Sequence, residues 1–87
     1  MVNTWPGNQP EDYQNLQETN RWVLDLWILN HLLPGRRMMS SYELKHIMER
    51  ENGLYVTNGQ FKGAMQQAGY NAHDTSEINW LYHVRVV

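Results

Sequence analysis

No cysteine occurs in the 87-residue chain, so disulfide bonds and thiolate metal ligands are excluded. An excess of basic charge is also missing, because seven lysine and arginine residues stand against nine aspartate and glutamate residues, for a net charge of −2. This is not the balance expected of a protein that coats nucleic acid nonspecifically, so any nucleic-acid contact must be local. No apolar run approaches the roughly 18 residues of a membrane span, and the first six residues lack the features of a signal peptide. We therefore expect a cytoplasmic protein without a membrane partner.

Residue patterns that carry catalysis are missing as well. The sequence has no Gly-x-Ser-x-Gly elbow, no glycine-rich phosphate loop and no cysteine nucleophile. No two of the four histidines are spaced three or four residues apart on one helix, so the spacing of a zinc site is absent. These histidines are His31, His46, His73 and His83. We therefore expect a protein that is not an enzyme and that has no metal site and no cofactor.

Aromatic residues, by contrast, are plentiful. The chain has four tryptophans and five tyrosines, and each aromatic side chain can bury about 150–250 Å², which enlarges a small core. A length of 87 residues leaves room for one core only. The first dozen residues contain Pro6, Gly7 and Pro10 without any period, as is typical of an extended arm. The prediction is an N-terminal arm over residues 1–12 and one compact domain over residues 13–87.

The longest predicted helix runs from Tyr13 to Leu33, where no proline or glycine interrupts a helical apolar spacing. Pro34-Gly35 is expected to end it. Its second half is apolar around nearly the whole circumference, which is typical of a helix buried on several sides. One face is therefore predicted to meet a second copy of the chain, as in a homodimer, or another partner. The residues of this face are Trp22, Leu26, Leu29 and Leu33.

Two shorter helices are predicted from their first residues. Ser40 can cap one of them, and Glu43 stands three residues further on, which completes a capping box. The same pattern recurs at Thr57 and Gln60, ahead of a helix that extends to Ala68. Both helices therefore have well-defined starts in the sequence.

Strand-like patterns occur at two places. Leu54–Val56 is short and β-prone, and residues 80–87 alternate apolar and polar side chains with a period of two. We expect these two segments to pair. The predicted fold class is α+β and mainly helical, with three helices and a short two-stranded sheet, in a helix-turn-helix-like or winged-helix-like arrangement.

The helix after Thr57 presents polar side chains opposite its apolar stripe, as the reading helix of a helix-turn-helix does. Amide side chains can form paired hydrogen bonds to adenine edges. The predicted reading set is Asn58, Gln60, Lys62, Gln66 and Gln67. The predicted phosphate contacts are Arg36, Arg37, Lys45 and Arg85. An ordinary solvated surface of mixed charge stays open as the alternative for both sets.

Several segments between residues 41 and 85 resemble small proteins carried by bacteriophages and other mobile elements. They are Ser41–His46, Tyr55–Phe61, Ala64-Met65, Gly69-Tyr70 and Asn79-Trp80. The resemblance implies a helix-turn-helix-like or winged-helix-like module and a phage or prophage setting. Small phage proteins also include inhibitors of host defence, such as anti-CRISPR proteins, which bind a protein target.

The expected function is that of a non-catalytic binding protein, a nucleic-acid-binding regulator or accessory factor. The alternatives are a phage-encoded protein-binding inhibitor of a host factor and an oligomeric assembly adaptor. Salt separates the first two, because binding to nucleic acid weakens steeply with added salt, whereas a largely apolar protein interface changes little.

Overall fold

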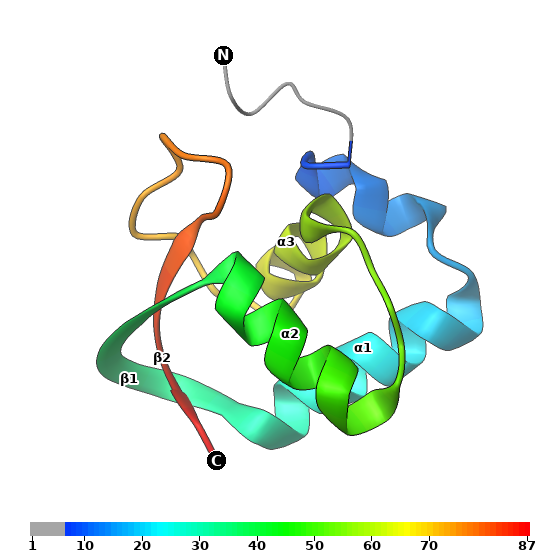
Figure 1. Cartoon of the computed structure of the whole chain (residues 1–87), viewed down its shortest axis with the longest axis horizontal. Helices are drawn as coiled ribbons and strands as arrows, with labels where there is room; N and C mark the ends of the chain where they lie inside the picture. Colours follow the sequence, from blue (N-terminus) through cyan, green and yellow to red (C-terminus); the bar gives the residue numbers. More distant parts are fainter. Residues whose placement is uncertain (1–6) are drawn as a thin grey trace.

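The computed structural model describes residues 7–87, which fold into helices on one side and a two-stranded sheet on the other (Figure 1). The helices are the 3-10 helix η2 (Pro10–Asn15), α1 (Glu18–His31), α2 (Ser41–Asn52) and α3 (Asn58–Gln67). The strands are β1 (Leu32–Ser40) and β2 (Leu81–Val86). The predicted class, α+β and mainly helical with a two-stranded sheet, is confirmed. Among the described residues, every helix is too short or too polar to reach across a lipid bilayer.

The single helix predicted from Tyr13 to Leu33 is wrong, because the chain breaks into η2 and α1 at Leu16 and Gln17, both in extended conformations. The break lets the Tyr13 hydroxyl donate a hydrogen bond of 2.6 Å to Asp25 Oδ2. Residues twelve apart in one continuous helix would be separated by about 18 Å along its axis, so that hydrogen bond requires the chain to turn. The boundary predicted after Asp12 accordingly falls inside η2, and residues 7–12 are not a separate arm. Residues 1–6 of the predicted arm lie outside the described residues.

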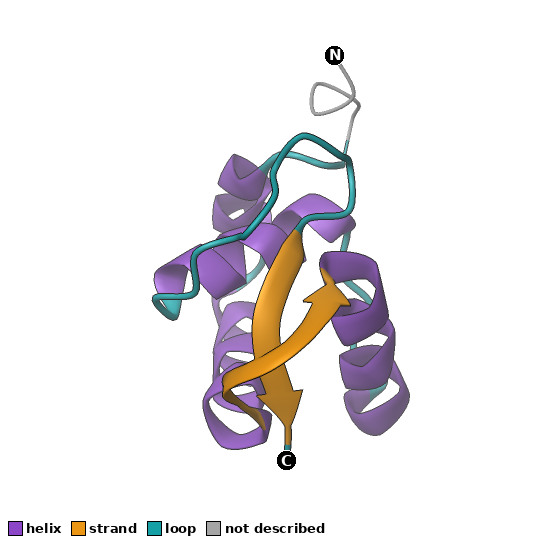
Figure 2. Cartoon of the chain, turned by 90° about the vertical axis from the view of Figure 1, so that its left-hand side faces the viewer, coloured by secondary structure: helices purple, strands orange, loops and turns teal. Residues whose placement is uncertain are grey.

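The sheet pairs β1 with β2 in antiparallel fashion, from Leu32 opposite Val86 to Ser40 opposite Leu81. The predicted partner of the C-terminal strand was wrong: Leu54–Val56 is not a strand, and the backbone N–H of Val56 donates to the Glu49 carboxylate instead. Pro34-Gly35 does not end a helix directly but lies within β1, three residues after α1 has stopped at His31. Figure 2 shows the two strands crossing in front of the helices.

Both predicted capping boxes are confirmed. The Ser40 side chain accepts a hydrogen bond from the backbone N–H of Glu43, whose carboxylate accepts one from the backbone N–H of Ser40. Thr57 and Gln60 form the same reciprocal pair at the start of α3. Each box satisfies two backbone donors that a helix start would otherwise leave without partners.

The core lies where α1, α2, α3 and the inner face of the sheet meet. Helix α3 is the most enclosed element, because η2 covers the side that faces away from α1 and α2 (Figure 1). The buried apolar residues of α3 are Phe61, Ala64 and Met65. They belong to one core cluster with residues of the other elements, among them Leu24, Trp27, Ile28, Leu32, Leu44, Met48, Tyr82 and Val84.

One core side chain carries a polar atom without a partner. The Tyr82 hydroxyl is buried and has no hydrogen-bond partner among residues 7–87. Burial raises the pKa of the Tyr82 phenol well above its ordinary value of 10.0, because the charged phenolate would lose its hydration. The folded state therefore keeps Tyr82 protonated at a pH where the unfolded chain ionises it.

Replacing Tyr82 with phenylalanine, as Tyr82→Phe, is expected to raise the free energy of unfolding by about 1–2 kcal/mol at neutral pH, because a buried unpaired hydroxyl costs about that much. Below about pH 10 both states hold the proton and the Tyr82 contribution is constant. Above it the unfolded state binds fewer protons, so stability falls with pH, and Tyr82→Phe is expected to reduce that fall.

Urea unfolding at pH 7 and pH 11 measures both effects. Tyr55→Phe, at a side chain 80% exposed, is the matched control with no expected change; a Tyr82→Phe variant less stable than the parent at pH 7 would contradict the prediction.

Candidate functional site

The predicted reading helix, α3, does not present the face that nucleic-acid readout requires. Residues Gly59 and Phe61–Met65 are all buried, and this run includes Lys62, which is 0% exposed. The Lys62 ammonium donates a hydrogen bond of 2.9 Å to the carbonyl of Asn8 and lies 4.7 Å from the ring centre of Trp80. Burial lowers the pKa of Lys62 below its ordinary value of 10.5. The prediction that Lys62 faces outward to contact nucleic acid is therefore wrong.

The side chain of Asn58 is also engaged in hydrogen bonds within the chain. Its side-chain amide donates to Asn8 Oδ1, to the carbonyl of Ile78 and to Asn79 Oδ1, and its oxygen accepts from the Ser41 hydroxyl. These hydrogen bonds join four separate segments of the chain at the start of α3. Because both ends of the amide are engaged, Asn58 is not free to read a base, contrary to prediction.

The other predicted readers are not brought together. Gln60 is half-buried and completes the capping box with Thr57. Gln66 and Gln67 are exposed at the far end of α3, where the helix closes. Lys45, a predicted phosphate contact, forms an ion pair of 3.1 Å with the buried carboxylate of Glu49. The helix-turn-helix mode of readout is thus not available to this face.

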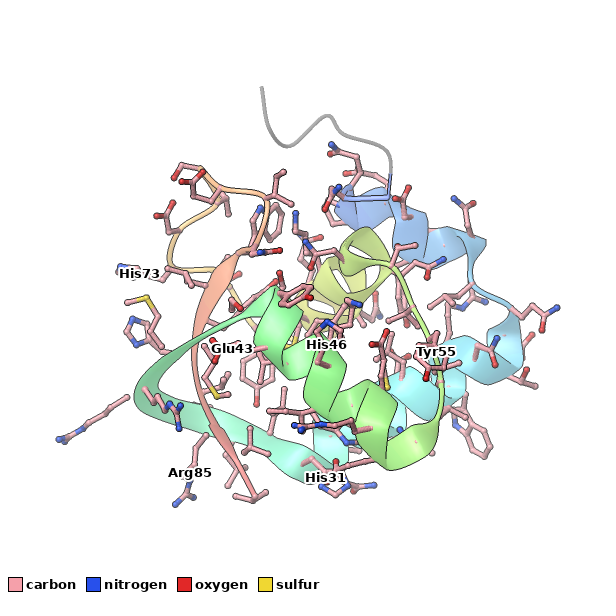
Figure 3. The ribbon with its side chains drawn as sticks, viewed as in Figure 1. His31, Glu43, His46, Tyr55, His73 and Arg85 are labelled. Atoms are coloured by element: carbon pink, nitrogen blue, oxygen red, sulfur yellow. The ribbon has the colours of Figure 1, made fainter. Side chains whose placement is uncertain are left out.

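The remaining predicted phosphate contacts do converge. Arg36, Arg37 and Arg85 line one open groove of about 810 Å³ between the sheet and α2, together with Arg50, which the predicted site did not include. The rest of the lining is Met39, Tyr42, Glu43, His46, Ile47, Val84 and Val86. We call this the arginine groove. Figure 3 labels Arg85 on β2 and Glu43 and His46 on α2, which lie on the two sides of it.

The irregular pairing of β1 explains the place of two of these arginines. The register passes from Pro34 opposite Val84 to Met38 opposite His83, so residues 35–37 have no partner on β2 and form a bulge. A Cβ atom at Gly35 would lie 2.9 Å from the backbone nitrogen of Arg85, so only glycine fits that close approach. The bulge carries Arg36 and Arg37 away from the sheet, and both are exposed.

Local periodicity places the other groove residues. Along β2 the side chains of Tyr82 and Val84 point into the core, so His83 and Arg85 point outward. On α2, Tyr42, His46 and Arg50 are spaced four residues apart and so lie along one side of the helix. The rings of Tyr42 and His46 meet edge to face, with centres 4.2 Å apart, and His46 Nδ1 is 3.3 Å from Glu49 Oε1. Tyr42 is thereby held at the groove while half its surface stays exposed.

Charge is segregated at the arginine groove. Four of the seven basic residues line it, whereas only one of the nine acidic residues, Glu43, does so. None of the four guanidinium groups forms an ion pair within residues 7–87, where the two ion pairs both involve Glu49. The groove is therefore an electropositive surface on a chain whose net charge is negative.

The arginine groove combines free guanidinium groups with a partly apolar floor made of the half-buried Ile47 and Val86 and the nearly buried Met39. Guanidinium groups bind phosphate and carboxylate oxygens through paired hydrogen bonds, and they stack on flat rings. A ligand that fits this lining carries anionic groups along its length and flat or apolar groups between them. Within residues 7–87 no group of three or more acidic or histidine side chains is placed to hold a metal ion.

Comparison of the chain with protein-family models found no match, and searches of curated proteins and of solved structures found no significant match. The resemblance to small phage and mobile-element proteins, and the helix-turn-helix-like or winged-helix-like arrangement, therefore stay predictions. The site is defined by its own geometry alone.

Proposed function

We propose that this protein is a small non-catalytic nucleic-acid-binding protein of phage or mobile-element type, a cytoplasmic regulator or accessory factor, that holds a single strand in the arginine groove. The observation that carries the proposal is the gathering of four of seven basic residues around one groove with a single carboxylate among them. Free arginine side chains in that arrangement can each contact a backbone phosphate.

A single strand suits the groove better than a duplex. Proteins that bind single strands combine a positively charged groove, which follows the backbone, with aromatic side chains on which bases stack. Tyr42 is half exposed beside Arg50 and His46 and supplies such a ring. Duplex readout needs a helix or ribbon that enters the major groove, and the middle of α3 is buried.

The salt dependence of binding tests this function directly. With four phosphate contacts on a single strand, the slope of log affinity against log salt is expected to be about −3, so affinity falls about 50-fold between 50 and 200 mM salt. Fluorescence anisotropy of a labelled single-stranded oligonucleotide of mixed sequence, titrated with the protein at several salt concentrations, measures the slope, and the matching duplex is the comparison. Absence of binding at the lowest salt would reject the proposal, and tighter binding of the duplex would reject the single-strand assignment.

A second candidate function is that of a protein-binding inhibitor of a host factor, as in anti-CRISPR proteins. One observation favours it: α1 exposes large apolar side chains, with Trp22 66% and Leu29 74% exposed. Exposed apolar surface of this kind marks protein interaction sites. Binding to a protein through α1 is expected to change little between low and moderate salt, unlike binding of a strand in the arginine groove.

A further inference from the structure

Helix α1 has two apolar sides. Leu24, Trp27 and Ile28 pack into the core, and at about 100° per residue they lie on the side opposite Trp22, Leu26 and Leu29. The last three fall within about 60° of the helix circumference and form one exposed row. Leu33, at the start of β1, is exposed and extends the row. We call these four residues the outer stripe, and no described residue of the same chain covers it.

A pocket of about 440 Å³ adjoins one end of the outer stripe, between α1, β1 and the end of α3. Leu29 and Leu33 belong both to the stripe and to the lining of this pocket. The rest of the lining is mostly apolar: Asp25, Ile28, Leu32, Gln67, Ala68 and Tyr70. The stripe therefore has a projecting tryptophan at one end and a hollow at the other.

The spacing of the stripe is the same in both directions. Its residues 22, 26, 29 and 33 are separated by four, three and four positions, so the pattern is symmetric about its midpoint. Two antiparallel copies of such a stripe place Trp22 of one opposite Leu33 of the other, and Leu26 opposite Leu29. A surface that matches itself after a twofold rotation is what a closed symmetric dimer requires.

We propose that the outer stripe binds a second copy of this chain, with the two α1 helices antiparallel and each Trp22 indole inserted into the pocket beside Leu33 of the other copy. The proposal does not depend on nucleic-acid binding, because the outer stripe and the arginine groove have no lining residue in common.

Charge at the ends of the outer stripe complements this arrangement. Glu18 lies four residues before Trp22 on the same side of α1, whereas Arg36 and Arg37 follow the Leu33 end along the chain. Antiparallel pairing brings Glu18 of one copy toward Arg36 and Arg37 of the other, which lowers the energy of the encounter. The opposed helix dipoles act in the same direction.

A stable dimer would bury the outer side of α1 together with the rim of the pocket. A standard interface buries about 800 Å² per partner, which is about one seventh of the accessible surface of 5434 Å². Helix α1 has 14 residues and is about 21 Å long, and the pocket rim on α3 widens the contact at one end. A central apolar row with charged residues at its ends is the usual anatomy of such an interface.

Sedimentation velocity across a concentration series tests the dimer. The parent chain is expected to form dimers, and Leu29→Glu is expected to raise the dissociation constant by about 100-fold or more, because it places a charge at the centre of the interface. Tyr55→Glu makes the same change of charge at an equally exposed site away from α1 and is expected to leave the dimer intact. Circular dichroism establishes that both variants are folded.

Single-cysteine variants test the antiparallel register, since the chain has no cysteine of its own. Leu26→Cys mixed with Leu29→Cys is expected to give mainly the mixed disulfide-linked dimer, whereas a parallel pair would join like with like. Like-with-like products, or a dimer unaffected by Leu29→Glu, would overturn the proposal. A chain that stays monomeric up to near-millimolar concentration would also overturn it, and would assign the outer stripe to a different protein partner.

Discussion

Reversing two charges in the arginine groove, in the double variant Arg36→Glu with Arg85→Glu, is expected to weaken single-strand binding by at least about 100-fold at low salt. Each guanidinium-to-phosphate hydrogen bond contributes about 1.5–3 kcal/mol, and each glutamate adds repulsion against the backbone. The slope of log affinity against log salt is expected to fall by more than one, since two of the four phosphate contacts are gone. Anisotropy with the same labelled oligonucleotide measures both quantities.

The matched control for this variant is Arg21→Glu. Arg21 lies on α1, away from the groove lining, and its exchange changes the net charge in the same direction. If the effect of Arg36 and Arg85 comes only from net charge, Arg21→Glu reproduces half of it; if it comes from the groove, Arg21→Glu changes affinity by less than about threefold at moderate salt, where distant charges are screened. Equal weakening per charge in the two variants would remove the arginine groove from consideration as the binding site.

Replacing Gly63 with alanine, as Gly63→Ala, is expected to lower the free energy of unfolding by about 3 kcal/mol, at the upper end of what overpacking costs. A Cβ atom on Gly63 would collide with the carbonyl oxygen of Pro10 and the Cβ of Tyr13. The obstacles belong to the backbone and to the root of a side chain, so no rotamer change relieves them. The least costly response is for η2 to move away from α3, which exposes Lys62 and the buried side of Tyr13. Urea unfolding measures the loss of stability.

Gly53→Ala is the control for that substitution. Gly53 has a φ of +71° and nothing within 4 Å of an added Cβ, so alanine there costs about 1 kcal/mol of backbone strain without any collision. Hydrogen exchange separates the two mechanisms, because Gly63→Ala is expected to speed exchange in residues 10–15 while Gly53→Ala leaves them protected. A Gly63→Ala chain of parental stability would show that η2 does not pack against α3 as described.

The parts of the fold that the sequence predicted correctly depend on neighbours along the chain. A capping box is complete within four residues, as at Ser40 and Glu43, so its chemistry is readable without knowledge of the rest of the fold. The alternation along residues 80–87 likewise predicted β2. The partner of β2 could not be predicted in this way, because Leu32 and Val86, which pair in the sheet, are 54 positions apart in the sequence. Pro34 and Gly35 also disfavour a strand there; the bulge accommodates Gly35, whereas Pro34 lies opposite Val84 at the edge of the bulge.

The residues of the candidate site were likewise predicted only in part from the sequence. Arg36, Arg37 and Arg85 were predicted as phosphate contacts from their charge alone, and the fold brings them to one groove. Tyr42 was missed and Arg50 was left out of the predicted set, although their spacing of eight residues on one helix was a usable signal.

Lys62 was misplaced because helical periodicity identifies one buried side of α3 and gives no sign that η2 covers the other. Gly59 and Gly63, four residues apart on that other side, were the available signal of a close approach.

The docking of residues 7–15 on α3 also fixes the order in which the chain can fold during synthesis. The hydrogen bond from Lys62 to Asn8 and the pairing of Leu32 with Val86 both join residues 54 positions apart. Residues near Asn8 leave the ribosome before α3 and cannot pack on it until it follows, and β1 likewise has no strand partner until β2 has been made. A nascent chain that has reached only the end of α2 thus lacks both of these contacts, and the core residues of α1, Leu24, Trp27 and Ile28, do not yet have α3 and β2 to pack against.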